Sequence, residues 1–228
     1  MITGSKGAPA APFLLPCRRL YSAFAAPWPM ALDDLFNQLR HPNPNMRSRA
    51  TVALAQSDDP TVVPRLMAML SEPDIPLRRS AVKALGTVGK RAVQSLTERL
   101  ASTDDLTIGS SCCKALAQVA DQWTGLQFPD ATLDLLCRKA LEPNPVVQIT
   151  AVMALGEMGE PALPRLQRVL QEGDVAVQVA CINALAGLGL DAAQADLQAQ
   201  AANETADAYV RESATAALAR CSMAKTRS

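Results

Sequence analysis

One pattern of polar and apolar positions recurs six times along the chain. Each copy begins with Asp or Asn, has a polar residue or Gly four positions later, a small residue three positions after that, and Ala-Leu after three more. Apolar residues at i, i+3 and i+4 lie on one face of an α-helix, so each copy predicts a helix with one buried face. The six leucines are Leu54, Leu85, Leu116, Leu155, Leu185 and Leu218. They lie 31, 31, 39, 30 and 33 residues apart, a period typical of solenoids.

The segments between the copies predict a second set of helices, because Leu66 and Leu70, or Leu96 and Leu100, again follow helical spacing. No segment alternates with period two over the length of a strand, so we expect no sheet. A single repeat cannot bury its apolar face alone and needs neighbours that cover it. The sequence therefore predicts an all-α fold, an α-solenoid (superhelix) of about six two-helix repeats.

Residues at the ends of the predicted helices support this division. The Asp or Asn that opens each copy suits an N-cap, where its side chain accepts from backbone N–H groups. Gly89, Gly159 and Gly189 follow three of the helices and suit the left-handed position after a helix end.

The first 29 residues differ from the rest of the chain. They carry three of its 22 basic residues, none of its 22 acidic residues and five prolines, which break any long helix there. We expect residues 1–29 to be a disordered N-terminal extension, followed by a repeat domain over residues 30–223. A targeting peptide and an upstream start before Met30 both fit the extension. The upstream start is favoured, because the apolar run at Leu14 is too short for a signal-peptide core.

Composition excludes several classes of function. The chain has no net charge, so no global field attracts nucleic acid, and no apolar run reaches the ~18 residues that a membrane-spanning helix needs. Its single histidine, His41, rules out a metal site built on paired histidines, so we expect no metal site. No catalytic residue can be assigned from the sequence.

The six cysteines contain no C-x-x-C pair, and their spacing does not indicate a disulfide framework. A reducing cytoplasm is the simpler location. Cys112 and Cys181 take the small core position of the repeat, and Cys113 takes a neighbouring apolar one. We therefore interpret these three as small buried hydrophobes. Cys137 falls in a first helix, where the pattern leaves room for partial exposure.

Basic residues gather on the second helices of the early repeats. Lys83 and Lys114 occupy the same repeat position, which becomes Met153 and Asn183 later in the chain. Arg49, Arg78 and Arg79 lie in the same half of the array. The second helices of a solenoid usually line its binding surface, so these five residues are candidates for ligand or partner binding. A solvated face with chance charges is the equally weighted alternative.

An insertion of about eight residues accounts for the 39-residue interval and contains Trp123 and Phe128. Trp123 is a further binding candidate if it presents an aromatic surface to a partner. The favoured alternative is that both rings fill a widened gap between repeats.

The strings AVKALGTVG, AVMALGEMG and INALAGLG resemble the HEAT-like repeats of phycobilisome lyases. The segments LFNQLRHPNPNMRSRATVALA and YVRESATAALAR are similar to the E/F-type phycobilin lyase family of cyanobacteria, and the resemblance covers residues 31–221. Deoxyhypusine hydroxylase has similar repeats but binds iron through His-Glu pairs, which a chain with one histidine cannot supply.

The resemblance implies a HEAT-repeat protein that binds phycobiliprotein subunits and acts as a phycobilin lyase or its accessory subunit. It implies a linear tetrapyrrole (phycobilin) as a transient ligand, no permanently bound cofactor, and a second HEAT-repeat lyase subunit as a further partner. A non-catalytic scaffold, such as a phycobiliprotein chaperone or a phycobilisome-turnover factor, is the alternative. If the bilin binds here, Lys83, Lys114 and Arg79 are placed to pair with its propionates.

Overall fold

The computed structural model describes residues 31–225 and, over that range, has twelve α-helices in six pairs and no strand. The first helices are α1 (Leu32–Gln38), α3 (Val62–Ala68), α5 (Lys90–Ser102), α7 (Asp130–Leu141), α9 (Leu163–Glu172) and α11 (Asp191–Ala202). The second helices are α2 (Pro44–Gln56), α4 (Ile75–Val88), α6 (Leu106–Gln122), α8 (Pro145–Glu157), α10 (Val175–Leu188) and α12 (Ala208–Lys225). Two 3-10 turns, η2 (Met69–Ser71) and η3 (Glu160–Ala162), adjoin α3 and α9. The predicted all-α solenoid of six two-helix repeats is confirmed. The expectation for residues 1–29 lies outside the described range.

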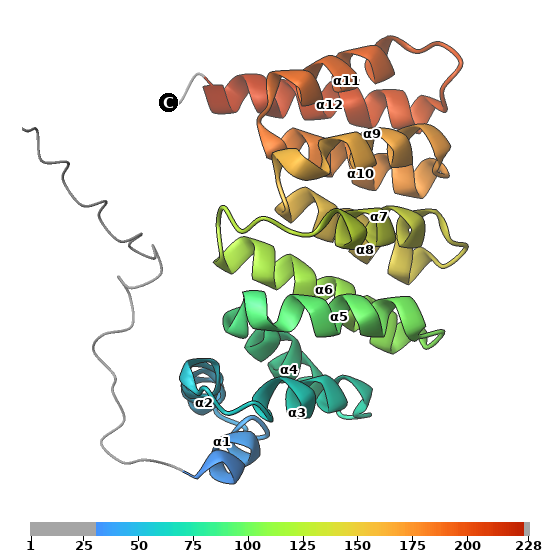
Figure 1. The fold of residues 1–228 in the computed structure, drawn as a ribbon. Coiled ribbons are helices and arrows are strands. Elements are labelled where there is room, and N and C mark those ends of the chain that lie inside the picture. Colours follow the sequence, from blue (N-terminus) through green and yellow to red (C-terminus); the bar gives the residue numbers. More distant parts are fainter. Residues whose placement is uncertain (1–30, 226–228) are drawn as a thin grey trace, which may run out of the picture.

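The helices form two layers that run the length of the stack (Figure 1). Each second helix packs on the next one, from α2 to α12, and the first helices cover one side of this layer. From the α3–α4 turn to the α11–α12 turn, the connections inside the repeats lie along one edge, on the right in Figure 1. The second helices α4 to α12 therefore start at the same edge of the molecule.

The core lies between the two layers and follows the repeated pattern. The small residue of each copy is fully buried, at Ala50, Ala81, Cys112, Ala151, Cys181 and Ala214. Leu54, Leu85, Leu116 and Leu155 are also fully buried, and Leu185 nearly so. Small side chains bring neighbouring helices close, and each leucine fills the space that remains between the layers.

The predicted N-caps form in five of the six second helices. The side chains of Asn43, Asp105, Asn144, Asp174 and Asp207 each accept a backbone N–H from the first turn. Asp74 makes no such bond, and Pro76 follows it at the second helical position. Proline has no N–H to donate, so one of the two usual donors to a capping carboxylate is missing there.

We predict that Leu85→Ala lowers the free energy of unfolding by about 2–5 kcal/mol, because it leaves a cavity at a fully buried site. Chemical denaturation followed by circular dichroism measures the loss. Lys83→Ala, two residues earlier on the exposed face of α4, is the control and should unfold like the wild type. Unchanged stability of Leu85→Ala would contradict the assignment of this helix face to the core.

Candidate functional site

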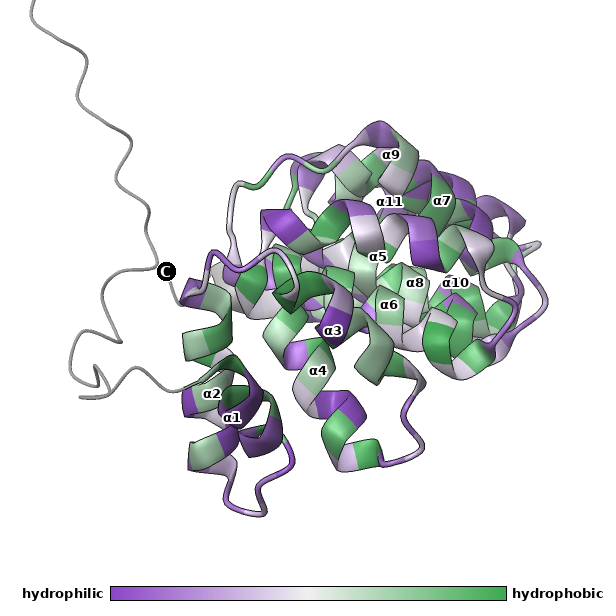
Figure 2. Cartoon of the chain, turned by 60° about the horizontal axis from the view of Figure 1, so that its bottom comes forward, coloured by the Kyte–Doolittle hydropathy of each residue, from purple (hydrophilic) through white to green (hydrophobic). Residues whose placement is uncertain are grey.

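The second helices carry the exposed apolar side chains of the molecule. Six large hydrophobic residues in the described part of the chain are between 39% and 61% exposed, and all six lie on second helices. Five of them occupy the first or second position of consecutive second helices: Ile75, Leu106, Val146, Val175 and Tyr209. We refer to these five as the apolar row. A row of exposed apolar residues on successive helices is a candidate for contact with a partner. The ribbons of α4, α6, α8 and α10 carry hydrophobic segments (Figure 2).

Exposed basic side chains lie beside this row on two adjacent helices. Arg79 and Lys83 belong to α4, Lys114 belongs to α6, and all three are exposed. We refer to them as the basic patch. Arg79 is four residues after Ile75, about 6 Å along the helix axis, and Met153 takes the position of Lys83 and Lys114 on α8. Arg49 is exposed on α2. The second-helix face therefore changes from basic to apolar between α4 and α8.

Arg78 is partly engaged inside its own repeat. Its Nη1 donates to the backbone oxygen of Glu72 at 2.7 Å, and the side chain is half-buried. Arg47 and Arg211, at the same repeat position, also donate to carbonyl oxygens of the preceding turn. An arginine at this position therefore closes the turn in these three repeats, and Arg78 stays an untested candidate with one Nη engaged inside its own repeat.

Trp123 lies between repeats rather than on the second-helix face. Its Nε1 donates to the backbone oxygen of Gly86 at 3.1 Å, and its ring packs against the core. Gly89 has a φ of 71°, and a Cβ added there would lie 2.4 Å from Cε2 of the indole. Trp123 therefore fills the gap that the insertion creates, and its indole N–H is used internally. Among the candidates, Arg49 and the three residues of the basic patch are the ones exposed on second helices.

The repeat pattern and the paired helices agree with a known family. A model described as HEAT repeats matches residues 32–120 and 132–219. The chain belongs to the HEAT-repeat family. Two relatives of the chain have names that refer to phycocyanin or to bilins, in agreement with the resemblance seen in the sequence.

One curated relative of this HEAT-repeat protein is 40% identical over 195 residues and is named "Uncharacterized phycocyanin operon protein Z", from Pseudanabaena tenuis (strain PCC 7409). The match covers 85% of this chain and 96% of that protein. "Bilin biosynthesis protein CpeZ" of Synechococcus sp. (strain WH8020) is 27% identical over 177 residues, 75% of this chain and 95% of that protein. Among solved structures, the complex of CpcE and CpcF of phycocyanin lyase from Nostoc sp. PCC7120 matches 68% of this chain and 97% of that chain, at 21% identity and a TM-score of 0.47.

The cysteines of the HEAT-repeat core are buried thiols. Burial raises the pKa of Cys112, Cys113 and Cys181 to about 12. The expectation of a partly exposed Cys137 is wrong, because this side chain is 3% exposed and its Sγ lies 3.8 Å from the backbone oxygen of Arg165. Burial raises the pKa of the Cys137 thiol as well. At neutral pH these four side chains are protonated, and a protonated thiol is a weak nucleophile.

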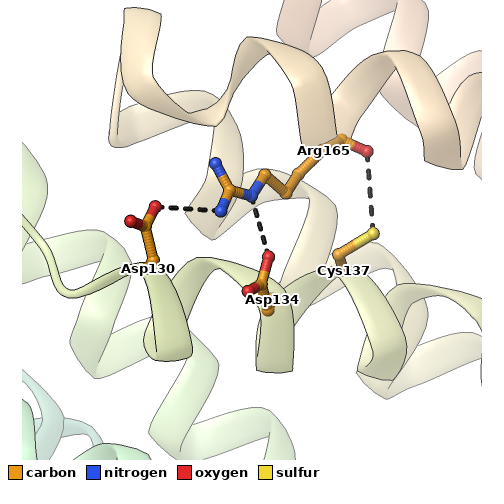
Figure 3. Close-up of polar contacts among 4 residues, drawn as sticks. All are labelled: Asp130, Asp134, Cys137 and Arg165. Carbon is orange, nitrogen blue, oxygen red and sulfur yellow. Dashed lines mark hydrogen bonds and ion pairs between the residues drawn. The ribbon is translucent and has the colours of Figure 1, made fainter.

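The side chain of Arg165 joins two repeats on the first-helix layer (Figure 3). Its Nε and Nη2 donate to Asp134 and Asp130 at 2.9 Å each, so α9 is held to α7. These carboxylates raise the pKa of the Arg165 guanidinium, and the hydrogen bond that Arg165 donates to Asp134 has the largest effect. The contacts account for both acids, so we interpret the cluster as a link between repeats.

His41 belongs to the turn before α2. Its Nδ1 accepts the backbone N–H of Asn43 at 3.0 Å. Over residues 31–225, no group of three or more His, Cys, Asp or Glu side chains is placed to hold a metal ion. In the same range, no helix combines the length and the apolar character that crossing a membrane requires.

We predict that Cys112, Cys113 and Cys181 resist alkylation by iodoacetamide in the folded protein. With a pKa of about 12 in place of 9.0, the thiolate fraction at pH 8 falls about a thousandfold. Mass spectrometry of peptides measures the labelling, and protein unfolded in urea is the control, in which all three should react. Rapid labelling of any of the three without urea would contradict their burial.

Proposed function

We propose that this HEAT-repeat protein binds phycobiliprotein subunits and acts as a phycobilin lyase, or as an accessory subunit of one, in bilin attachment. The observation that carries the proposal is its similarity, over nearly their whole lengths, to proteins named for the phycocyanin operon and for bilin biosynthesis. The exposed second-helix face supplies a surface for such partners. The cytoplasmic location expected from the sequence is part of the same proposal, and the free thiols support it.

The bilin would lie on the second helices beside the basic patch. A linear tetrapyrrole has two propionates and a conjugated apolar ring system. Lys83 and Lys114 project from adjacent helices at the same repeat position, and helices that pack directly are about 8–10 Å apart. They can therefore each meet one carboxylate, with Arg79 as a third cation. The rings would then extend towards Met153 and the apolar row. The bilin is a transient ligand in this proposal.

Such a protein would act mainly by positioning. Holding a bilin and an acceptor cysteine in contact lowers the entropic barrier to their reaction. The buried thiols Cys112, Cys113 and Cys181 are protonated at neutral pH and face the core, so the reacting thiol belongs to the phycobiliprotein acceptor in this proposal. The protein's part is to bind the bilin propionates and to dock the acceptor.

The exposed face of α12 supports a second HEAT-repeat subunit as a further partner. The position that Cys113 and Ile182 occupy is fully buried by the next second helix, whereas the equivalent Thr215 on α12 is exposed. Thr215, Ala216 and Ala219 line a hollow of about 500 Å³ on this end face. A further repeat from another subunit would cover the face in the way that each second helix covers the one before it.

A non-catalytic scaffold is the alternative, either a phycobiliprotein chaperone or a phycobilisome-turnover factor. The apolar row favours a binding role, because it spans five consecutive repeats and its side chains offer apolar contacts but no catalytic groups. The only histidine of the chain is engaged in a turn outside the second-helix face. The candidate site therefore has no histidine that could act as a general acid or base.

Co-expression with phycobiliprotein subunits in a bilin-producing host separates these functions. Covalent bilin absorbance on the acceptor that depends on this protein supports the lyase, alone or with a second HEAT-repeat subunit. A stable complex whose formation leaves bilin attachment unchanged supports the scaffold. Neither a complex nor an effect on attachment, with every candidate subunit tested, would contradict both.

We predict that Lys83→Glu/Lys114→Glu weakens binding of the phycobiliprotein or its bilin by about tenfold or more, because two attractive charge contacts become repulsive. Titration followed by bilin absorbance measures the affinity. Lys90→Glu/Arg99→Glu makes the same change of charge at exposed positions of the first helix α5 and should bind like the wild type. Equal affinity of both double variants would exclude the basic patch from the site.

A further inference from the structure

One position of the repeat is used to close the turn between its two helices. At this position, which we call the clamp position, Arg47, Arg78, Gln178 and Arg211 donate to backbone oxygens five to eight residues earlier. In four of the six repeats, therefore, a long donor side chain folds back over the turn. The arginines donate to carbonyl oxygens of the turn itself, and Gln178 donates to Leu170 in the last turn of α9.

The third repeat lacks this side chain, because its clamp position is Gly109. The backbone does not require glycine there, since Gly109 lies inside α6 and is not among the residues with positive φ. A Cβ added to it would come no closer than 3.6 Å to Val147, its nearest neighbour. The glycine instead leaves space. A hollow of about 410 Å³ opens at Gly109, between the turn of the third repeat and the turn of the fourth.

The lining of this hollow suits an arginine side chain, because it offers apolar groups to the aliphatic stem and oxygen atoms to the guanidinium. Leu100 and Val147 form an apolar part of the lining. Thr103 and Asp104, which also line it, lie six and five residues before Gly109, where the arginines of other repeats find their acceptors. In the described part of the chain, no hydrogen-bond donor is found for the backbone oxygen of Thr103 or of Asp104.

The charges at the rim also favour a cation. Lys139 is paired with Glu142 at 2.9 Å, so these two lining residues nearly cancel. The carboxylates of Asp104 and Asp105 remain, and Asp105 also caps α6 through its Oδ1. Carboxylates and backbone oxygens together bind guanidinium groups through charge-assisted hydrogen bonds.

We propose that the hollow at Gly109 receives an arginine side chain from a partner polypeptide, which completes the third repeat in place of its own missing clamp. Leu106 belongs both to the rim of the hollow and to the apolar row. The partner's arginine therefore enters from the second-helix face while neighbouring apolar residues of the partner rest on the row. This inference names the chemistry by which the partner of the proposed function docks, and in that respect it rests on that function.

The blocked tripeptide acetyl-Ala-Arg-Ala-amide tests the pocket without any natural partner. Titration of the full-length, isotope-labelled protein should shift the backbone amide signals of Thr103, Asp105 and Gly109 in NMR spectra. The citrulline analogue has the same shape without the charge and should shift them much less. Equal shifts with the two peptides, or no shift with either at millimolar concentration, would overturn the proposal.

Gly109→Arg supplies the missing clamp from within the chain and should exclude the peptide. It should fold with an equal or higher Tm than the wild type, because the same residue stands at this position in three other repeats. Gly109→Ala is the matched control, since it adds only a Cβ for which there is room and leaves the hollow open. Unchanged peptide shifts in Gly109→Arg would overturn the proposal. Should that variant fold poorly, Asp104→Lys, at an exposed position, reverses a charge at the rim and should also remove the shifts.

Binding of a phycobiliprotein subunit provides the second measurement. Gly109→Arg should weaken it by about tenfold or more, as loss of a buried arginine anchor does, and Gly109→Ala should not. If the wild type binds the tripeptide at Gly109 but no phycobiliprotein, the proposed function fails and the pocket stands. If it binds phycobiliprotein equally in all variants, the pocket proposal fails and the proposed function stands.

Discussion

The close packing of each second helix on the next is the constraint on which the rest of the structure depends. A Cβ added to Gly86 would lie 2.6 Å from Cβ of Gln118, and one added to Gly156 would lie 3.0 Å from Cβ of Ala184. The small core residues of the repeat allow the same closeness elsewhere. Because the second helices pack so tightly, their outward side chains form one continuous face, and the intra-repeat turns from α3–α4 to α11–α12 align along one edge. Both the basic patch and the hollow at Gly109 result from this alignment.

Much of the fold could be predicted from the sequence, because it rests on local and periodic signals. The spacing of Leu85 and its equivalents identified the buried face, and the Asp or Asn before each copy identified the caps. The burial of Cys137 does not follow from the repeat pattern, because it depends on a tertiary contact with Arg165 at the start of α9.

The candidate site was harder to predict, because its contacts are tertiary. Arg78 and Arg79 are adjacent in the sequence, but one binds the turn of its own repeat and the other is exposed. The hydrogen bond from Trp123 to Gly86 spans 37 residues and has no local signature. The apolar row had a signal that sequence reasoning missed. Ile75, Leu106 and Val175 each directly follow an aspartate at the N-cap position, where the first turn of a helix is the least covered by its neighbours.

The contact between Gly86 and Gln118 has a consequence for the geometry of recognition. It joins α4 to α6 through backbone and Cβ atoms, and Trp123 is hydrogen-bonded across the same joint. Interfaces made by flexible side chains can slide, whereas backbones in contact have little freedom to adjust. The separation between the Cα atoms of Lys83 and Lys114 is therefore set by the main-chain packing of these two helices. If this pair binds the ligand as proposed, a ligand with two anionic groups fits best when their spacing matches that of the two lysines.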